Sequence, residues 1–401
     1  MTNRLRRLAR VLAIGVTAAA LVASCTTGDG AASDRTGGPV STGKSTTTTT
    51  TTTPTPTTTT LVPPDGKTAA DRTLTLEKEI TGDLTPKSVV WSGGDRFFAQ
   101  NMIYSHTIGV YDRAFNRVAL IPDTVRLSGF GFPQYPDTYQ GGPVEIAFSP
   151  DGKYAYASNY QMYGPGFGNP GNDNCSAGNW DPSFVYRIDV AKFAIDQVIE
   201  VGPVPKYVAV TPDDKYVLVT NWCGYDMSVI DTATAKEVAK IPIGPYPRGI
   251  VVSPDSRTAY VAIMGGSGID VVDLTTLQVA NQIEGVGRAP RHLVLSPDGA
   301  ILYVTLNGEG DVAKVDLASG TVVGRVATGQ APRSMAISDD GTALYVVNYD
   351  SGTMSKVRTA DMTVLQSVNT NQHPIGITYD PATRHVWVAN YSGSLQIFSD
   401  T

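Results

Sequence analysis

The sequence predicts an all-β fold, a seven-bladed β-propeller with four-stranded blades, from three observations. The first is a hairpin unit that recurs along the chain, in which two β-rich runs such as Leu293–Leu295 and Ile301–Leu306 flank a Ser-Pro-Asp-Gly turn. The second is the regular spacing of a proline that begins the inner run of each unit. The third is a single strand pattern, at about residues 73–80, that belongs to none of the units.

The spacing of these prolines sets the number of blades. The last four steps between them are 42 or 43 residues long, and the two earlier steps are longer because each contains an insertion. Such a period, with several short strands in each copy, is typical of propellers. Seven copies therefore predict seven blades, which begin at Pro86, Pro143, Pro205, Pro247, Pro290, Pro332 and Pro374.

Each copy divides into four strands, and the third copy shows the pattern most clearly. Its expected strands, from the inside outward, are Tyr207–Val210, Tyr216–Asn221, Met227–Asp231 and Val238–Ile243. The fourth copy repeats this order at 250–252, 259–263, 269–273 and 279–283. An aspartate ends the third strand of most copies, and we expect its side chain to cap the following turn by hydrogen bonds. These residues are Asp112, Asp189, Asp231, Asp273 and Asp316.

The two ends of the repeat region predict how the ring closes. The last copy has strand patterns at 375–379, 385–390 and 395–398 but no pattern for an outer strand. We expect the unassigned strand at about 73–80 to supply it, because this pairing would remove the open edge of the last blade.

The first 25 residues resemble a bacterial lipoprotein signal peptide. A basic start precedes an apolar stretch and then small residues directly before Cys25, which would receive the lipid. An ordinary secretory signal that carries a cysteine is the alternative. Residues 26–66 are rich in Thr and Pro and predict a disordered tether, which leaves residues 67–401 for the propeller. We therefore expect a protein anchored by lipid to the cell membrane, on its extracytoplasmic side.

The charge of the chain narrows the class of partner. The formal net charge is −6, and without the four arginines among the first ten residues it becomes −10. An acidic body argues against general nucleic-acid binding, which depends on neutralising phosphates with cations. We expect a monomer.

The second strands carry a motif that supports the same fold. They end in Tyr303-Val304-Thr305-Leu306-Asn307, Tyr345-Val346-Val347-Asn348 and Trp387-Val388-Ala389-Asn390. Together with the Ser-Pro-Asp-Gly turns, this motif resembles that of the YVTN family of bacterial and archaeal surface β-propellers, over roughly residues 85–398. The resemblance implies the fold but no single function. Members are variously linked to nucleic-acid binding or cell-surface roles, and related propellers include lactonases and quinoprotein subunits.

Strand direction predicts that several cations meet at one end of the central channel. The inner strand starts, and the second strand ends, at what we call the upper face, while the Ser-Pro-Asp-Gly turns lie on the lower face. The residue after each proline should then surround the upper mouth of the channel. These residues are Lys87, Val144, Lys206, Arg248, Arg291, Arg333 and Ile375. Five like charges are costly together, so we expect either an anionic ligand or pairing of each cation with an acid or carbonyl of a neighbouring blade.

Two insertions are expected on the same upper face. They are residues 123–141, with Phe130, Phe132, Tyr135 and Tyr139, and residues 160–182. With Trp222, Tyr349 and Tyr391, these aromatic residues would form a rim above the cations. The alternative is that the insertions only cover the channel.

The two cysteines of the predicted propeller lie in neighbouring loops. Cys175 belongs to the second insertion and Cys223 to the equivalent loop of blade three, so outside the cytoplasm we expect them to form a disulfide. A reactive thiol is the alternative. Nearby Asp173 is interpreted as a turn residue rather than a calcium ligand.

No strong catalytic or metal-binding motif is present in the sequence. It has no nucleophile elbow, His-Glu-x-x-His, phosphate loop or paired-cysteine motif. His106, His292 and His373 come from different blades, so we predict no metal and no other cofactor. The preferred function is non-catalytic binding of a ligand or protein partner at the upper face. The alternatives are a lactonase-like hydrolase with Glu145 as the base, a quinoprotein-like electron-transfer subunit, and a scaffold in a surface assembly.

Overall fold

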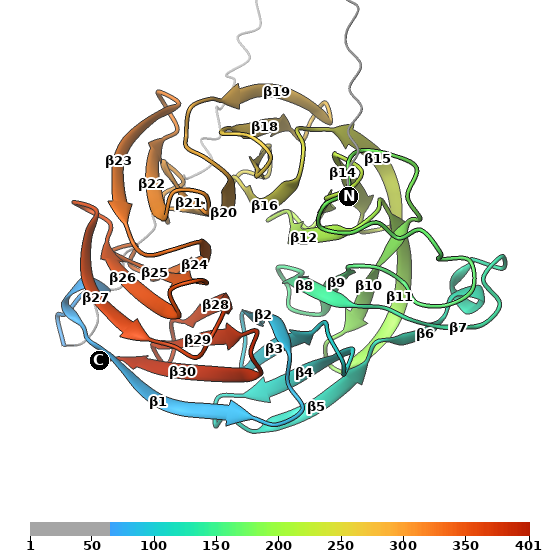
Figure 1. The fold of residues 1–401 in the computed structure, drawn as a ribbon, viewed down its shortest axis with the longest axis horizontal. Coiled ribbons are helices and arrows are strands. Elements are labelled where there is room, and N and C mark those ends of the chain that lie inside the picture. Colours follow the sequence, from blue (N-terminus) through green and yellow to red (C-terminus); the bar gives the residue numbers. More distant parts are fainter. Residues whose placement is uncertain (1–64) are drawn as a thin grey trace, which may run out of the picture. The chain divides into compact units, whose positions relative to one another are not determined.

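The computed structural model describes residues 65–401. The predicted signal segment 1–25 with Cys25, and nearly all of the predicted tether 26–66, lie outside the described residues. Residues 65–401 contain seven four-stranded sheets, which are arranged as the blades of a ring (Figure 1). The predicted fold class is therefore confirmed.

In blades one to six the chain runs from the innermost strand to the outermost. Blade one contains β2 (Pro86–Trp91), β3 (Arg96–Asn101), β4 (Thr107–Asp112) and β5 (Arg117–Pro122), and blade two contains β8 (Pro143–Phe148), β9 (Tyr154–Asn159), β10 (Ser183–Asp189) and β11 (Ala194–Val201). Blade three contains β12 (Pro205–Val210), β13 (Tyr216–Asn221), β14 (Asp226–Asp231) and β15 (Lys236–Pro242), and blade four contains β16 (Pro247–Val252), β17 (Thr258–Ile263), β18 (Ile269–Asp273) and β19 (Gln278–Ile283). Blade five contains β20 (Pro290–Leu295), β21 (Ile301–Leu306), β22 (Asp311–Asp316) and β23 (Thr321–Ala327), and blade six contains β24 (Pro332–Ile337), β25 (Ala343–Asn348), β26 (Thr353–Arg358) and β27 (Thr363–Asn369).

The inner strands begin at the prolines themselves, up to three residues before the start that we expected. Pro205, for example, already pairs with Asn221, and the register shifts between Pro205 and Tyr207. The proline therefore belongs to the strand although it cannot donate a ladder hydrogen bond. This irregularity recurs in all seven inner strands.

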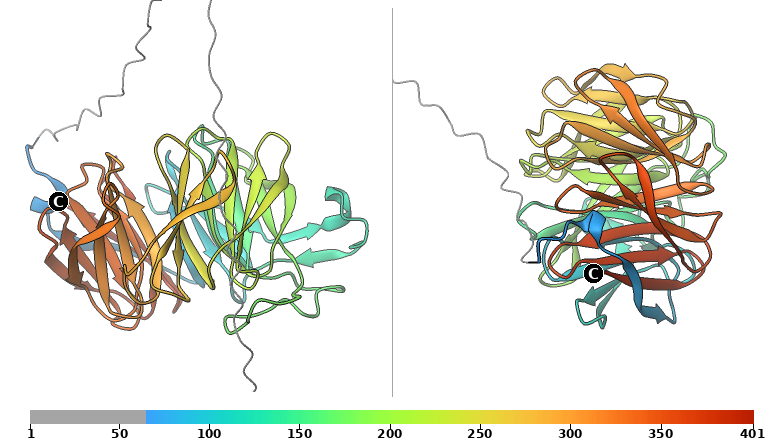
Figure 2. Two further views of the ribbon diagram at one scale, coloured as in Figure 1. Left: turned by 90° about the horizontal axis from the view of Figure 1, so that it is seen from above. Right: turned by 90° about the vertical axis from the view of Figure 1, so that its left-hand side faces the viewer.

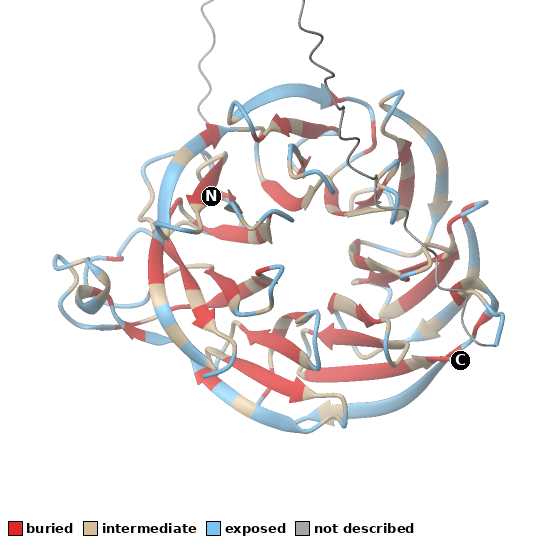
Figure 3. Cartoon of the chain, turned by 180° about the vertical axis from the view of Figure 1, so that it is seen from behind, coloured by how far each residue is buried: buried red, intermediate tan, exposed pale blue. Residues whose placement is uncertain are grey.

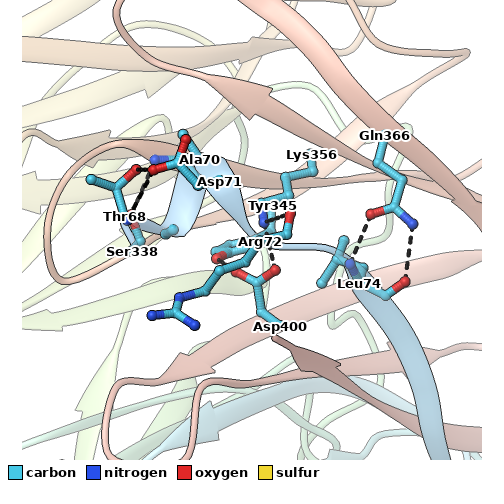
Figure 4. Close-up of polar contacts among 12 residues, drawn as sticks. Thr68, Ala70, Asp71, Arg72, Leu74, Ser338, Tyr345, Lys356, Gln366 and Asp400 are labelled. Carbon is cyan, nitrogen blue, oxygen red and sulfur yellow. Dashed lines mark hydrogen bonds and ion pairs between the residues drawn. The ribbon is translucent and has the colours of Figure 1, made fainter. Parts of the chain in front are cut away.

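Blade seven is closed by the N-terminal strand, as predicted. It contains β28 (Pro374–Asp380), β29 (His385–Asn390), β30 (Ser394–Asp400) and β1 (Leu74–Thr81), with β1 antiparallel to β30. Lys356 Nζ donates to Asp400 Oδ1 at 2.5 Å and to the Arg72 carbonyl at 2.8 Å, and Lys356 and Asp400 are completely buried (Figure 4). The Gln366 side chain bonds both the N–H and the carbonyl of Leu74, at 2.8 and 2.9 Å. Side chains of blade six therefore also bind the N-terminal segment that contains β1.

Apolar side chains fill the space between neighbouring blades. Phe97 of blade one stacks on Trp387 of blade seven with ring centroids 4.1 Å apart, and both residues are fully buried. Burial falls toward the outer strands, where Val238 and Val323 are exposed (Figure 3). Close packing between blades makes the ring a rigid frame for its centre.

The aspartates at the ends of the third strands cap the outer turns, as predicted. The Asp231 carboxylate accepts the Thr234 N–H at 2.8 Å, and the Asp316 carboxylate accepts the Ser319 N–H at 2.7 Å. Equivalent bonds exist at the other three positions. These aspartates are therefore structural.

The helices of the described residues are two short 3-10 turns, η1 (Ala69–Asp71) and η2 (Leu127–Phe130). No helix within residues 65–401 is long and apolar enough to cross a membrane.

Candidate functional site

A repeated backbone arrangement positions the residues that follow the inner-strand prolines. In blades three to seven the residue before the proline has a φ of 52° to 58°, which is unusual outside glycine. Its carbonyl accepts an N–H from the loop after the second strand, as Ala331 does from Tyr349 at 3.0 Å and His373 does from Tyr391 at 2.9 Å. The sequence gives no sign of this conformation, because the residues concerned are Val204, Tyr246, Ala289, Ala331 and His373.

Five cations follow inner-strand prolines and lie together, and we call them the cation ring: Lys87, Lys206, Arg248, Arg291 and Arg333. Lys206, Arg248 and Arg291 are buried, and Lys87 and Arg333 are partly buried. Burial and then the positive charges of the other four lower the pKa of Lys87 well below its usual value. Burial and the neighbouring Arg248 and Arg333 do the same for the pKa of Arg291. The ring is therefore electrostatically strained.

Two arginines donate hydrogen bonds to backbone carbonyls of neighbouring blades, which is the second of the two possibilities given above. Arg248 donates to the Lys206 carbonyl, and Arg291 Nη1 donates to the Arg333 carbonyl at 2.5 Å. Each of these guanidinium groups offers five N–H donors, yet makes a single hydrogen bond within residues 65–401. In the same part of the chain, the buried Nε of Arg333 has no partner. The structural bonds thus leave donors free for a ligand.

Aromatic rings lie against three cations of the ring. The Arg333 guanidinium is 4.0 Å from the centroid of Tyr349, and Lys87 Nζ is 4.9 Å from that of Tyr391. Lys206 Nζ is 4.3 Å from the Tyr160 ring and 5.2 Å from that of Trp222. The three aromatic residues predicted for the site therefore contact its cations directly, although Trp222 is itself buried.

The second insertion supplies an acid to the ring. Asp173 accepts a hydrogen bond from Lys206 Nζ, and Tyr160 Oη donates to the same carboxylate oxygen at 3.1 Å. Burial opposes ionisation of Asp173, but the charge of Lys206 outweighs it and lowers the pKa of Asp173 to about 2. The predicted disulfide between Cys175 and Cys223 is present, with their Cα atoms 5.7 Å apart. It ties the second insertion to blade three, as expected, whereas the contact of Asp173 with Lys206 was not predicted from the sequence.

Glu145 lies in the field of the same cations. Burial raises its pKa to about 7, although Arg248 acts in the opposite direction. Burial likewise lowers the pKa of Lys206 to about 8, although Asp173 offsets part of the effect. Near neutral pH the ring therefore carries more positive than negative charge.

The first insertion does not form a rim above the cations, so this expectation was wrong. Residues 123–141 fold into the hairpin β6 (Thr124–Arg126) and β7 (Thr138–Gln140) with η2 between them, and the hairpin lies at the periphery of blade two (Figures 1 and 2). Its aromatic residues pack on blade two and on Phe167 of the second insertion, for example Tyr135, whose ring centroid is 4.5 Å from that of Phe167. The aromatic residues of the first insertion therefore have a structural role, because they form a small hydrophobic core with blade two.

A cavity of about 590 Å³ occupies the channel on the lower side of the cation ring. It is lined by the inner strands and by residues next to the lower turns, including Trp91 and Pro212. Glu145, Tyr207 and His292 are also among its lining residues. Sequence analysis had identified Glu145 but missed Tyr207, which occupies the equivalent position on its strand.

The histidines do not gather into one site. His106 lies against Tyr163, His373 stacks on Tyr349, and His385 bonds to Glu77 at 2.8 Å. Within residues 65–401 no group of three histidine, cysteine or acidic residues is placed to hold a metal ion.

Comparisons with known proteins support the seven-bladed propeller. A family model of YNCE-like β-propellers matches residues 181–346, and a model described as lactonase, 7-bladed β-propeller, matches residues 312–400. Each match spans less than half of the chain. No match was found among curated proteins.

One similar solved structure is that of Kuenenia stuttgartiensis hydrazine synthase. It aligns with a TM-score of 0.64 and 19% identity, over 79% of this chain and 96% of the other. At this identity the likeness concerns the fold alone.

Proposed function

We propose that this protein is a non-catalytic, extracytoplasmic propeller that binds an anionic ligand, or an anionic group of a partner, at the cation ring. The observation that carries the proposal is the convergence of five cations on a ring with too few acids. Among residues 65–401, Asp173 and the exposed Asp350 are the aspartates whose charges act on the ring cations, and Glu145 stands near its point of half-protonation at neutral pH. An anion would relieve the mutual repulsion and use the unbonded guanidinium donors.

The aromatic neighbours favour a ligand that also has a flat or apolar surface. Tyr391 is partly exposed beside Lys87, so a sugar ring or a planar group could rest on it while its anionic group meets the cations. The Tyr349 ring is already covered by Arg333 and His373. Anionic glycans are therefore the first class of ligand to test.

Binding should depend on the three arginines of the ring. We expect the triple variant Arg248→Gln, Arg291→Gln, Arg333→Gln to bind inorganic phosphate and oligogalacturonate at least tenfold more weakly by isothermal titration calorimetry. The control has the same change in charge at three exposed positions, Arg117→Gln, Arg126→Gln, Arg257→Gln, and should bind like the wild type. Unchanged binding by a folded ring variant would refute the site.

We further propose that the chain is a lipoprotein of the YVTN type, anchored through Cys25. The motif at the ends of the second strands and the small residues before Cys25 support this. Mass spectrometry of the protein purified from membranes should find a diacylated N-terminal cysteine, and Cys25→Ser should release the protein from the membrane. A mature protein that retains an unmodified Cys25 would contradict the anchor.

A further inference from the structure

The channel cavity has small apolar side chains along its middle and polar groups at its inner end. Val90, Ala147, Ala209, Val251 and Ala336 occupy equivalent positions on five inner strands, are partly exposed, and line the cavity. The residue before each of them is buried and packs between blades. The five cations are not among the lining residues, so they stand beyond the inner end of the cavity. The shape is that of an apolar shaft that leads toward the lower turns.

The inner end of this shaft is polar. Tyr207 Oη is 3.1 Å from His292 Nε2, and the Met335 N–H points at His292 Nδ1 at 3.4 Å. Burial and the charge of Arg291 lower the pKa of His292 to about 3, so the ring is neutral. With Nδ1 accepting, Nε2 carries the proton and donates to Tyr207, whose own hydroxyl proton remains free to donate to a bound molecule. Glu145 adds a carboxyl group, and a hydrogen bond from the Ser88 side chain partly offsets the effect of burial on its pKa.

Two arginines of the cation ring lie close to these polar groups. Arg248 and Arg291 both influence the ionisation of Glu145 and Tyr207 through their charge, which places the two guanidinium groups close to the polar end. Arg248 also bonds to the carbonyl of Lys206, the residue before Tyr207. A negatively charged head group at this end would therefore be stabilised, whereas a positively charged one would be repelled.

We propose that the channel cavity binds an amphiphilic carboxylate, which enters from the lower face with its carboxylate first and leaves its apolar chain along the shaft. The carboxylate would accept a hydrogen bond from Tyr207 and lie in the field of Arg248 and Arg291. Because burial raises the pKa of Glu145 to about 7, this residue can hold a proton near neutral pH and donate a second hydrogen bond. The volume of about 590 Å³ is within the range of small-molecule pockets.

This inference goes beyond the binding proposed for the upper face, because the ligand reaches the protein from the opposite side. It predicts a division of effects between two sets of variants. Changes in the partly exposed upper cations, Lys87→Gln with Arg333→Gln, should weaken phosphate binding and leave octanoate binding unchanged. Variants of the shaft should weaken octanoate binding and leave phosphate binding unchanged.

The first experiment measures octanoate binding by calorimetry. We expect Ala209→Trp, which fills the shaft, to reduce the affinity at least tenfold, while Ala233→Trp on an exposed turn has no effect. Tyr207→Phe removes only the hydroxyl and should reduce affinity about fivefold to tenfold, which keeps the test valid if the larger residue disturbs folding. Octanol should bind more weakly than octanoate. Equal affinity for the two, or no effect of any shaft variant, would overturn the proposal.

The second experiment determines the orientation of the bound carboxylate in the shaft. Trp91 lines the cavity near the lower face, so 8-bromooctanoate should quench its fluorescence and 2-bromooctanoate should not. The Trp91→Phe variant identifies the part of the signal that comes from Trp91. Quenching by the 2-bromo compound alone would reverse the orientation, and quenching by neither would place the ligand outside the shaft.

Discussion

Glu145 shows how burial in the channel makes one residue a determinant of the pH response. Its pKa is raised from 4.5 to about 7, mainly by burial, so the folded state holds this proton more tightly than the unfolded state does. Between these two values the folded state binds more protons, and folding stability contributed by Glu145 therefore falls as pH rises. A permanently neutral side chain would escape this loss.

We therefore expect Glu145→Gln to become more stable relative to the wild type as pH rises from 4.5 to 8, by at most ~3 kcal/mol. The lowered pKa of His292 has the opposite sign but is present in both proteins, so it cancels in the difference. Urea denaturation at several pH values measures the effect. Glu284→Gln, at an exposed position, is the matched control, and a pH-independent difference for Glu145→Gln would contradict the assigned environment.

The residues of the ring were predictable because they obey the repeat. Lys206, Arg248 and Arg291 each follow a proline at the start of an inner strand, so their common position followed from strand direction alone. The contribution of Asp173 could not be predicted in this way. It comes from a loop outside the repeat, and only the fold shows that its carboxylate meets Lys206.

Elements outside the repeat were also the least predictable. Sequence alone assigned residues 123–141 to the upper face because they join two blades there, but the hairpin β6–β7 leans outward to bury its aromatic residues against blade two. Repeated strands were placed to within about three residues, since each copy confirms the others. A single insertion has no second copy, so its packing partner cannot be inferred from periodicity.

The second insertion should depend strongly on its disulfide. The bond between Cys175 and Cys223 closes a loop with a sequence separation of 48 residues, for which the chain-entropy model gives about 4 kcal/mol. We expect the double variant Cys175→Ala, Cys223→Ala to lose about 2–4 kcal/mol of unfolding free energy in urea. Dithiothreitol should have a similar effect on the wild type and none on the variant. A reductant effect that persists in the variant would assign the loss to another cause.

At the scale of the whole molecule, the ring depends on a strand from the other end of the propeller. Deletion of residues 1–81 removes β1 and leaves the edge of β30 unpaired. It also exposes the Lys356–Asp400 ion pair, which is buried in the full chain. We expect this variant to aggregate or to melt well below the full chain by size-exclusion chromatography and thermal unfolding. Deletion of residues 1–64 is the control and should leave a stable monomer. A stable, monomeric 82–401 fragment would show that closure is dispensable.

The pairing of β1 with β30 also has a consequence for how the protein is made. Leu74–Thr81 leaves the ribosome roughly 300 residues before Ser394–Asp400, and bringing such distant segments together carries a loop-closure cost that grows with the length between them. The earliest strand must wait unpaired until the last one is synthesised. During synthesis the repeats therefore form an open arc with a free edge, and the ring is sealed only after β30 has been released.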